Sequence, residues 1–190
     1  WNVQHEGRSR CPDQCIRAGA GDSVLMQTAE KDRDILSLYQ EIILDHGKSP
    51  RNAGTVERHD CRSEGKNPLC GDRVTVTAAL DDDGRVADLK FDGKGCAISI
   101  ASASMMTEAV KGLTAEEAKV MTGAVNTLCR EVTSPDAIME ELGDELGPRL
   151  KRLSALSGVR QFPARVKCAN LPWHTLISCL DGAGNVSTEG

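Results

Sequence analysis

The chain shows its first helical periodicity over residues 32–46. One stripe of mostly apolar side chains repeats there with the spacing of one face of an α-helix: Ile35, Leu38, Tyr39, Ile42 and His46. Gly47 directly after the stripe and Pro50 beyond it favour a helix end at that point. We expect His46 to cap or pack the helix end rather than to bind a metal.

Residues 74–91 have the pattern of a β-hairpin. Apolar side chains alternate with small or polar ones in the first strand: Val74, Val76, Ala78 and Leu80. A turn signal of three aspartates and a glycine follows, and residues 86–91 return as the second strand. The preceding stretch, 48–72, is rich in proline and glycine and predicts loops. At most it holds a short edge strand over 55–62, in which His59 and Cys61 are exposed and bind no metal.

Further helices are predicted after the hairpin, over residues 97–110, 114–121, 135–142, 148–156 and 169–180. Thr114 and Glu117 have the spacing of a capping box, and Ser134-Pro135 is a typical helix start. The short helices between 112 and 158 form a helical insert. Residues 1–29 and 182–190 show no period, so we expect a disordered extension and a flexible tail around a domain over 30–181.

Composition narrows the class of protein. The net charge is −5 and the pI about 5.4, which argues against a nucleic-acid partner. The chain has no apolar run long enough for a transmembrane helix. Eight cysteines would suit a secreted disulfide scaffold, but the length and helical pattern favour reduced thiols in the cytoplasm, some of them on a metal. Among the cysteines that are not candidate metal ligands, Cys11 and Cys15 are expected in the disordered extension, while Cys129 and Cys179 are expected to pack.

A candidate metal site begins at Cys70-Gly71-Asp72. Pro68 and Gly71 bracket Cys70, so the thiol is expected at a loop apex with a carboxylate two residues later. Cys96 falls where a strand ends and a helix begins, and Cys168 starts the last predicted helix. Side chains at element ends can converge, so the four residues predict one four-coordinate site. Their spacing alone is a weak signal, because it matches no zinc-ribbon pattern.

Five blocks in order resemble the NifU/IscU family of iron–sulfur assembly proteins over about residues 35–180. The blocks are LYQEIILDH at 38–46, SPRN at 49–52, NPLCGD at 67–72, GKGCAIS at 93–99 and FPARVKC at 162–168. The resemblance implies an α+β fold in which a small antiparallel sheet of about three strands packs against several helices. It also implies that three cysteines and an aspartate surround one metal.

Two features are similar to the SufU-like branch of that family. The 72 positions from Cys96 to Cys168 hold the helical insert of that branch, and Lys167 stands where scaffolds of the IscU type carry a histidine ligand. The resemblance implies Zn²⁺ on Cys70, Asp72, Cys96 and Cys168. Cys70 would accept persulfide sulfur from a pyridoxal-phosphate cysteine desulfurase, for use by downstream proteins of the SUF system.

The sequence leaves two interpretations of a neighbouring pair of cations, and two alternative functions for the chain. Arg165 and Lys167 flank the predicted site and would hold anionic sulfur species, although a solvated basic pair is an equal interpretation. The same four ligands would also serve a scaffold that binds and transfers a nascent Fe–S cluster. A structural zinc module that only docks partners is the third hypothesis.

Overall fold

The computed structural model describes residues 37–132 and 134–188. A helix covers 37–48, so it continues through Gly47, two residues past the end predicted at residue 46. The remaining elements follow in chain order: β1 Cys61–Asn67, β2 Asp72–Leu80, β3 Val86–Lys94, α2 Ala97–Val110, α3 Ala115–Arg130, α4 Pro135–Arg152, the 3₁₀ helix η1 Ser154–Gln161, α5 Pro163–Leu180 and β4 Val186–Ser187. The predictions for residues 1–29 and for Ile35 lie outside the described residues.

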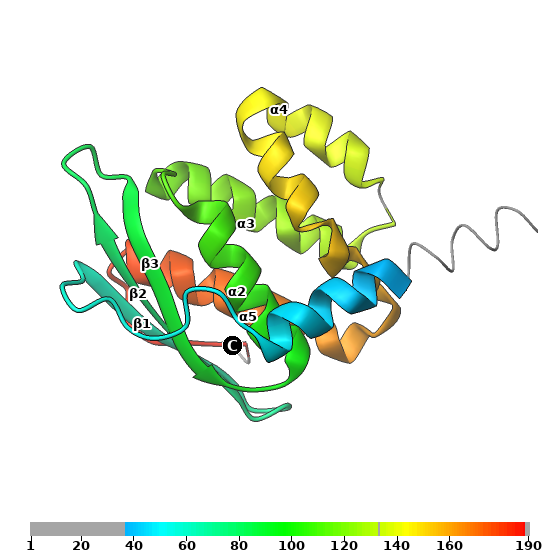
Figure 1. Cartoon of the computed structure of the whole chain (residues 1–190), viewed down its shortest axis with the longest axis horizontal. Helices are drawn as coiled ribbons and strands as arrows, with labels where there is room; N and C mark the ends of the chain where they lie inside the picture. Colours follow the sequence, from blue (N-terminus) through cyan, green and yellow to red (C-terminus); the bar gives the residue numbers. More distant parts are fainter. Residues whose placement is uncertain (1–36, 133, 189–190) are drawn as a thin grey trace, which may run out of the picture. The chain divides into compact units, whose positions relative to one another are not determined.

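A four-stranded sheet packs on one face against helices, which confirms the α+β class (Figure 1). The strand order is β3-β2-β1-β4, with β1, β2 and β3 antiparallel and β4 parallel to β1. Helix α5 packs against β1 and β2, and α2 packs against β3. The sheet is therefore mixed and has one strand more than expected, because β4 forms within the segment expected to be a flexible tail.

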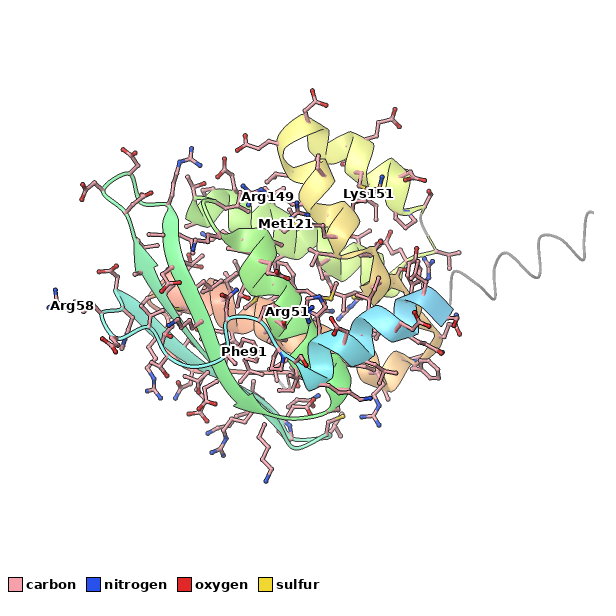
Figure 2. All side chains as sticks on the ribbon, in the orientation of Figure 1. Arg51, Arg58, Phe91, Met121, Arg149 and Lys151 are labelled. Carbon is pink, nitrogen blue, oxygen red and sulfur yellow. A yellow bond between two sulfur atoms is a disulfide. The ribbon has the colours of Figure 1, made fainter. Side chains whose placement is uncertain are left out.

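The core between sheet and helices is built largely from aliphatic side chains and methionine, with few aromatic residues. Figure 2 labels two of its members, Phe91 from β3 and Met121 from α3, which are 2% and 0% exposed. Small residues on α2 bring α5 close to it. The Ser102 hydroxyl donates to the Ala169 carbonyl (2.6 Å) and accepts from Trp173 Nε1 (3.1 Å), so the two helices are joined by buried hydrogen bonds.

Strand β1 lies later in the chain than the edge strand predicted over 55–62. Its inward-facing residues are small or polar, namely Ser63, Gly65 and Asn67, so the alternation carries no apolar signal. A Cβ on Gly65 would lie 2.0 Å from Thr175 Oγ1, which explains why glycine stands where β1 crosses α5. The strand prediction was wrong because close packing, rather than hydrophobicity, selected these residues.

The insert contains longer helices than the sequence predicted. The capping box of Thr114 and Glu117 is confirmed, but α3 continues to Arg130 instead of ending near residue 121. Its buried face continues through Val125 and Leu128, which explains the extension. In α4 the backbone breaks at Gly143 (φ 71°), directly after the predicted helix end at residue 142.

Helix α5 also begins earlier than predicted. It starts at Pro163 rather than residue 169, so Cys168 lies in its second turn and Pro172 lies in its interior, where proline had been expected at the helix start. Proline has no N–H and therefore cannot donate to the carbonyl four residues before it, which is that of Cys168. Among the described residues, no helix has both the length and the apolar character needed to cross a membrane.

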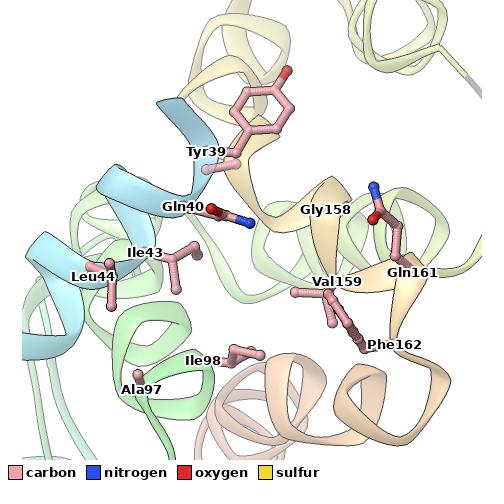
Figure 3. Close-up of a pocket in the computed structure, with 11 residues that line it drawn as sticks. Tyr39, Gln40, Ile43, Leu44, Ala97, Ile98, Gly158, Val159, Gln161 and Phe162 are labelled. Carbon is pink, nitrogen blue, oxygen red and sulfur yellow. The ribbon is translucent and has the colours of Figure 1, made fainter. Parts of the chain in front are cut away.

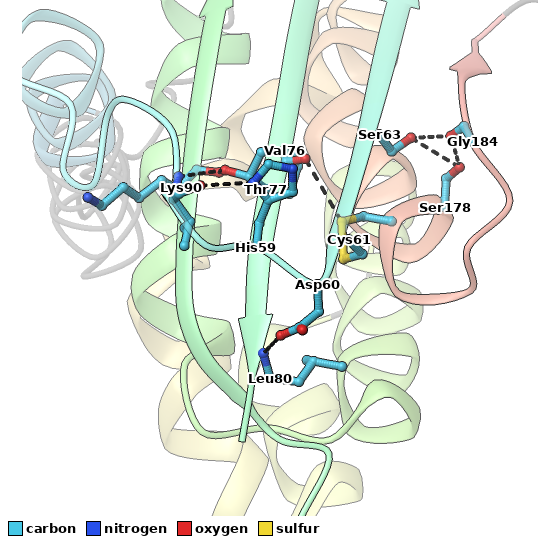
Figure 4. Close-up of a disulfide and its surroundings, with 12 residues drawn as sticks. His59, Asp60, Cys61, Ser63, Val76, Thr77, Leu80, Lys90, Ser178 and Gly184 are labelled. Carbon is cyan, nitrogen blue, oxygen red and sulfur yellow. Dashed lines mark hydrogen bonds between the residues drawn. A yellow bond between two sulfur atoms is a disulfide. The ribbon is translucent and has the colours of Figure 1, made fainter. Parts of the chain in front are cut away.

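Cys61 and Cys179 form a disulfide between β1 and α5 (Figure 4). Their Cα atoms are 5.3 Å apart although 118 positions separate them in sequence. The expectation of an exposed, unpaired Cys61 and a packing thiol at Cys179 is therefore wrong, as is the expectation of reduced thiols for this pair. The pairing depends on β1 lying against α5, and neither β1 nor the start of α5 was placed correctly from the sequence.

Removing this disulfide should lower the melting temperature. A cross-link that closes so long a loop restricts the unfolded chain and typically contributes about 2–4 kcal/mol, which for a domain of this size corresponds to roughly 5–15 °C. We expect Cys61→Ser/Cys179→Ser to melt lower than the wild type by that amount in calorimetry. A reductant should lower the wild type toward the double variant and leave the double variant unchanged. Equal melting temperatures without reductant would contradict the assignment.

Candidate metal centre

The turn between β1 and β2 holds the first two candidate ligands. Asn67 pairs with Asp72 across the hairpin, and the Cys70 amide donates to the Asn67 carbonyl (3.3 Å). Gly71 has φ +70°, a left-handed conformation that favours glycine. Cys70 is consequently half-buried in a tight turn, while Asp72 begins β2 and is only 2% exposed.

Asp72 is fixed by the start of helix α2. Its Oδ1 accepts a hydrogen bond from the Cys96 amide (2.8 Å), and its Oδ2 lies 3.8 Å from Cys96 Sγ. Cys96 is the N-cap residue of α2, so its amide points toward the carboxylate from a helix end that favours negative charge. A Cβ on Gly95 would lie 2.7 Å from Asp72 Oδ1, so this approach requires the glycine.

Helix α5 brings Cys168 to the same place. Cys168 is fully buried, and its Sγ lies 3.2 Å from Cys70 Sγ. The ligand atoms of Cys70, Asp72 and Cys168 all lie within 4.8 Å of one another. The structure thus brings three of the four predicted ligands into one group, and the fourth, Cys96, stands beside it in contact with Asp72.

Two pKa shifts describe the electrostatics of the group: that of the Cys168 thiol and that of the neighbouring Arg165 guanidinium. Burial raises the pKa of the Cys168 thiol, and its hydrogen bonds with Asp72 and Cys70 raise it further. Arg165 Nη1 donates to Cys70 Sγ at 3.4 Å. Hydrogen bonding to Cys168 and the nearby cysteines raise the pKa of this arginine, so it remains a fixed positive charge beside the turn.

Lys167 does not share the position of Arg165. It lines a separate depression on the flank of α5, together with Arg130, Asn170 and His174. The sequence had placed both cations beside the site. Of the two, Arg165 hydrogen-bonds to a candidate ligand, and no such bond from the Lys167 side chain is present within the described residues.

The other histidines and thiols considered from the sequence have different surroundings. His46 Nδ1 hydrogen-bonds to Ser104 Oγ (2.8 Å), and His59 Nδ1 to the Val56 carbonyl (2.9 Å). Cys129 is fully buried, and burial raises its pKa to about 12, so it is an unreactive packing thiol at neutral pH. Within the described residues none of the three belongs to the group of converging ligands.

One contact was missed from the sequence. Asn67 Nδ2 donates to Cys168 Sγ at 3.4 Å, across 101 positions of the chain. Asn67 is 1% exposed, so its side chain contributes a buried donor directly beside a thiol. The sequence showed this residue only as part of a turn, because its contact depends on how α5 crosses the end of β1.

An apolar depression of about 330 Å³ lies between the first helix, the start of α2 and the segment before α5 (Figure 3). Tyr39, Ile43 and Leu44 of the first helix form one wall, and Val159 and Phe162 form another. Ala97 and Ile98 form part of the lining, directly after Cys96 in sequence. None of the candidate ligands lines this depression, and Cys96 is linked to it through its sequence neighbour Ala97.

The donor set suits a thiophilic cation. Thiolates and a carboxylate are zinc ligands, and zinc held by four protein ligands is almost always tetrahedral. Asp72 and Cys168 are almost completely buried, and a cation would compensate the charge that burial there disfavours. Among the described residues, three such donor atoms lie within 4.8 Å of one another, and a fourth, Cys96 Sγ, lies 3.8 Å from Asp72 Oδ2.

Comparison with known proteins identifies the family to which the chain is similar. The family described as NifU-like N terminal domain matches residues 38–169. The zinc-dependent sulfurtransferase SufU of Bacillus subtilis (strain 168) is 44% identical over 140 residues, which are 74% of this chain and 87% of that protein. The iron-sulfur cluster assembly scaffold protein IscU of Streptococcus pyogenes serotype M1 is 34% identical over 148 residues, 78% of this chain and 86% of that protein.

Solved structures give the same result. A putative iron-sulfur cluster assembly scaffold protein for the SUF system from Fervidobacterium islandicum AW-1 is 36% identical, with a TM-score of 0.58 over 74% of this chain and 94% of that chain. A nitrogen-fixing NifU-like protein (N-terminal) from Brucella abortus is 26% identical, with a TM-score of 0.63 over 77% and 94%. In fold, motifs and overall similarity, this chain belongs to the family of NifU-like N-terminal domains.

Proposed function

We propose that this protein takes part in iron–sulfur cluster assembly as a zinc-dependent sulfur acceptor. Cys70 would receive persulfide sulfur from a cysteine desulfurase and deliver it to downstream proteins of the SUF system, in the cytoplasm. The observation that carries the proposal is the setting of Cys70: its sulfur lies 3.2 Å from Cys168 Sγ and 3.4 Å from the Arg165 guanidinium, on a half-exposed turn. The printed name of the Bacillus subtilis relative supports the same activity.

The four ligands in this proposal are Cys70, Asp72, Cys96 and Cys168. Bound zinc would hold the coordinating thiols as thiolates without any redox chemistry of its own. Three of the four are restrained by the fold: Asp72 by the Cys96 amide, Cys96 by the start of α2, and Cys168 by its burial in α5. Cys70 lies in the turn and is the ligand best able to move toward a donor.

Sulfur transfer to Cys70 needs no external oxidant. The Cys70 thiolate donates its electron pair to the terminal sulfur of the desulfurase persulfide and forms a new S–S bond. The S–S bond of the donor breaks, and its electron pair remains on the desulfurase cysteine, which leaves as a thiolate. Arg165 would stabilise negative charge on Cys70 before the transfer and on the Cys70 persulfide after it.

Replacing Cys70 should abolish the acceptor activity. Wild-type protein incubated with a SUF-type cysteine desulfurase and cysteine should gain about 32 Da, the mass of one sulfur, in intact-mass spectrometry, since the persulfide carries one added sulfur. Cys70→Ser should show no such adduct and should not stimulate the desulfurase. Cys129→Ser, which removes a buried thiol away from the turn, is the control and should behave as the wild type. An equal adduct on Cys70→Ser would rule out the assigned acceptor.

Asp72→Asn should reduce the zinc content of the purified protein. The substitution preserves shape but removes the ligand charge. Mutation of a residue that only hydrogen-bonds to a metal ligand typically costs about 10–100-fold in metal affinity, so loss of a charged direct ligand should cost at least as much. Asp82→Asn in the exposed β2–β3 turn is the matched control. Metal analysis should give about one zinc per wild-type chain. A visible cluster chromophore with little zinc, after anaerobic purification, would instead favour an Fe–S scaffold.

Arg165 and Lys167 should differ in a sulfur-transfer assay. Arg165→Ala removes a charged donor to Cys70 Sγ, and a charge-assisted hydrogen bond of this kind corresponds to roughly a tenfold to hundredfold change in rate. Its zinc content should be unchanged, which separates the effect from metal loss. Lys167→Ala should remain within about twofold of the wild type, a change typical of a surface residue. Equal losses in the two variants would contradict the specific role of Arg165.

A further inference from the structure

Three cations lie side by side across the sheet at the end that carries the metal ligands. The strand register pairs Lys66 of β1 with Arg73 of β2, and Arg73 with Lys94 of β3. Their neighbours Asn67, Asp72 and Val74 face the core, so these three side chains project from the opposite face of the sheet. We refer to Lys66, Arg73 and Lys94 as the cationic row.

The cationic row is exposed and incompletely neutralised. The side chains of Lys66 and Arg73 are 49% and 64% exposed, and both contact the same carboxylate oxygen of Glu64, at 3.4 and 3.1 Å. Lys94 is also exposed, and within the part of the chain that the structure describes it forms no ion pair. One carboxylate therefore bridges two of the three cations, and the third lacks such a partner.

The charge pattern changes along the sheet away from the metal ligands. The next row on this face is Glu64, Thr75 and Asp92, and the row after it is Arg62, Thr77 and Lys90. In both of these rows an uncharged threonine separates the charged residues. Only the cationic row, among these three, places like charges directly opposite each other, an arrangement that destabilises a sheet.

The position of the cationic row links it to the candidate centre. Lys66 and Arg73 are the residues directly before Asn67 and directly after Asp72, and Lys94 precedes Cys96 by two residues. The row thus runs along the base of the turn that carries Cys70. The whole chain has a net charge of −5, so this positive edge is opposite in sign to the protein as a whole. A protein that approaches Cys70 meets local positive charge.

We propose that the cationic row is a docking surface for an acidic face of the cysteine desulfurase. The proposal rests on the proposed function, since it assumes a sulfur donor that must reach Cys70. A row of three strands spans only about 10 Å, which suits a small cluster of carboxylates on a folded protein. Complementary charge at this edge speeds the encounter and orients the donor relative to Cys70.

The register supplies a matched pair of variants. Lys66→Glu/Lys94→Glu reverses two charges of the cationic row, and Arg62→Glu/Lys90→Glu reverses two charges in the same strands, two rows farther from the turn. Both variants change the net charge equally. Circular dichroism and melting temperature establish that each is folded, and Lys66→Gln/Lys94→Gln provides a milder test of the same row.

Stimulation of a SUF-type cysteine desulfurase is then measured as a function of the concentration of each variant. We expect the concentration for half-maximal stimulation to rise about tenfold for Lys66→Glu/Lys94→Glu, as for charges that guide association. It should rise less for the glutamine variant and less than twofold for Arg62→Glu/Lys90→Glu. The maximal rate should change little. Ionic strength near 0.5 M should remove most of the difference between the variants, because screening is then strong.

The outcomes separate the two proposals. If the wild type accepts sulfur and both glutamate variants behave alike, the docking surface is overturned while the acceptor function remains. If the wild type neither stimulates the desulfurase nor gains sulfur at any salt concentration, the proposed function itself fails. If Lys66→Glu/Lys94→Glu loses affinity for a single-stranded oligonucleotide but not for the desulfurase, the row belongs to a nucleic-acid site and the proposal is wrong.

Discussion

The hydrogen bond from the Cys96 amide to Asp72 Oδ1 is the constraint on which the candidate centre depends. It joins the first residue of β2 to the N-cap residue of α2, and so connects the sheet to the helical layer at one point. Gly95 permits the approach because a side chain there would collide with the carboxylate. One short contact thereby orients a carboxylate and positions a thiol before any cation binds, which is the preorganisation that metal sites require.

The remaining ligands differ in how firmly they are held. Cys168 is buried in a helix that hydrogen-bonds to α2 through Ser102, and Asn67 donates directly to its sulfur. Cys70 occupies a turn that depends on the left-handed conformation of Gly71. The fold produces this inequality by combining a helix, a strand end and a turn, and the proposed sulfur-acceptor role would require it.

Local chemistry explains which parts of the structure were predictable. The β2–β3 hairpin follows from apolar alternation, and the capping box at Thr114 marks the start of α3. The candidate ligands stood out because proline, glycine and predicted element ends surround the cysteines. In each case the signal lies within a few residues along the chain.

Features that depend on contacts between distant segments could not be predicted in this way. Strand β1 faces the core with Ser63, Gly65 and Asn67, residues chosen for close packing against α5 rather than for hydrophobicity. Strand β4 consists of two residues whose pairing depends on the place of β1. The contact between Asn67 and Cys168 and the bond between Cys61 and Cys179 likewise require the same crossing of β1 and α5.

That last bond has a topological consequence for the whole centre. Residues 61 to 179 form a covalently closed ring, and Cys70, Asp72, Cys96 and Cys168 all belong to it. A single cleavage of the backbone anywhere in the helical insert would open the ring but leave both pieces joined through sulfur. The insert between Cys96 and Cys168 is thus a region where evolution or engineering can break or reconnect the chain without separating the ligands from one another.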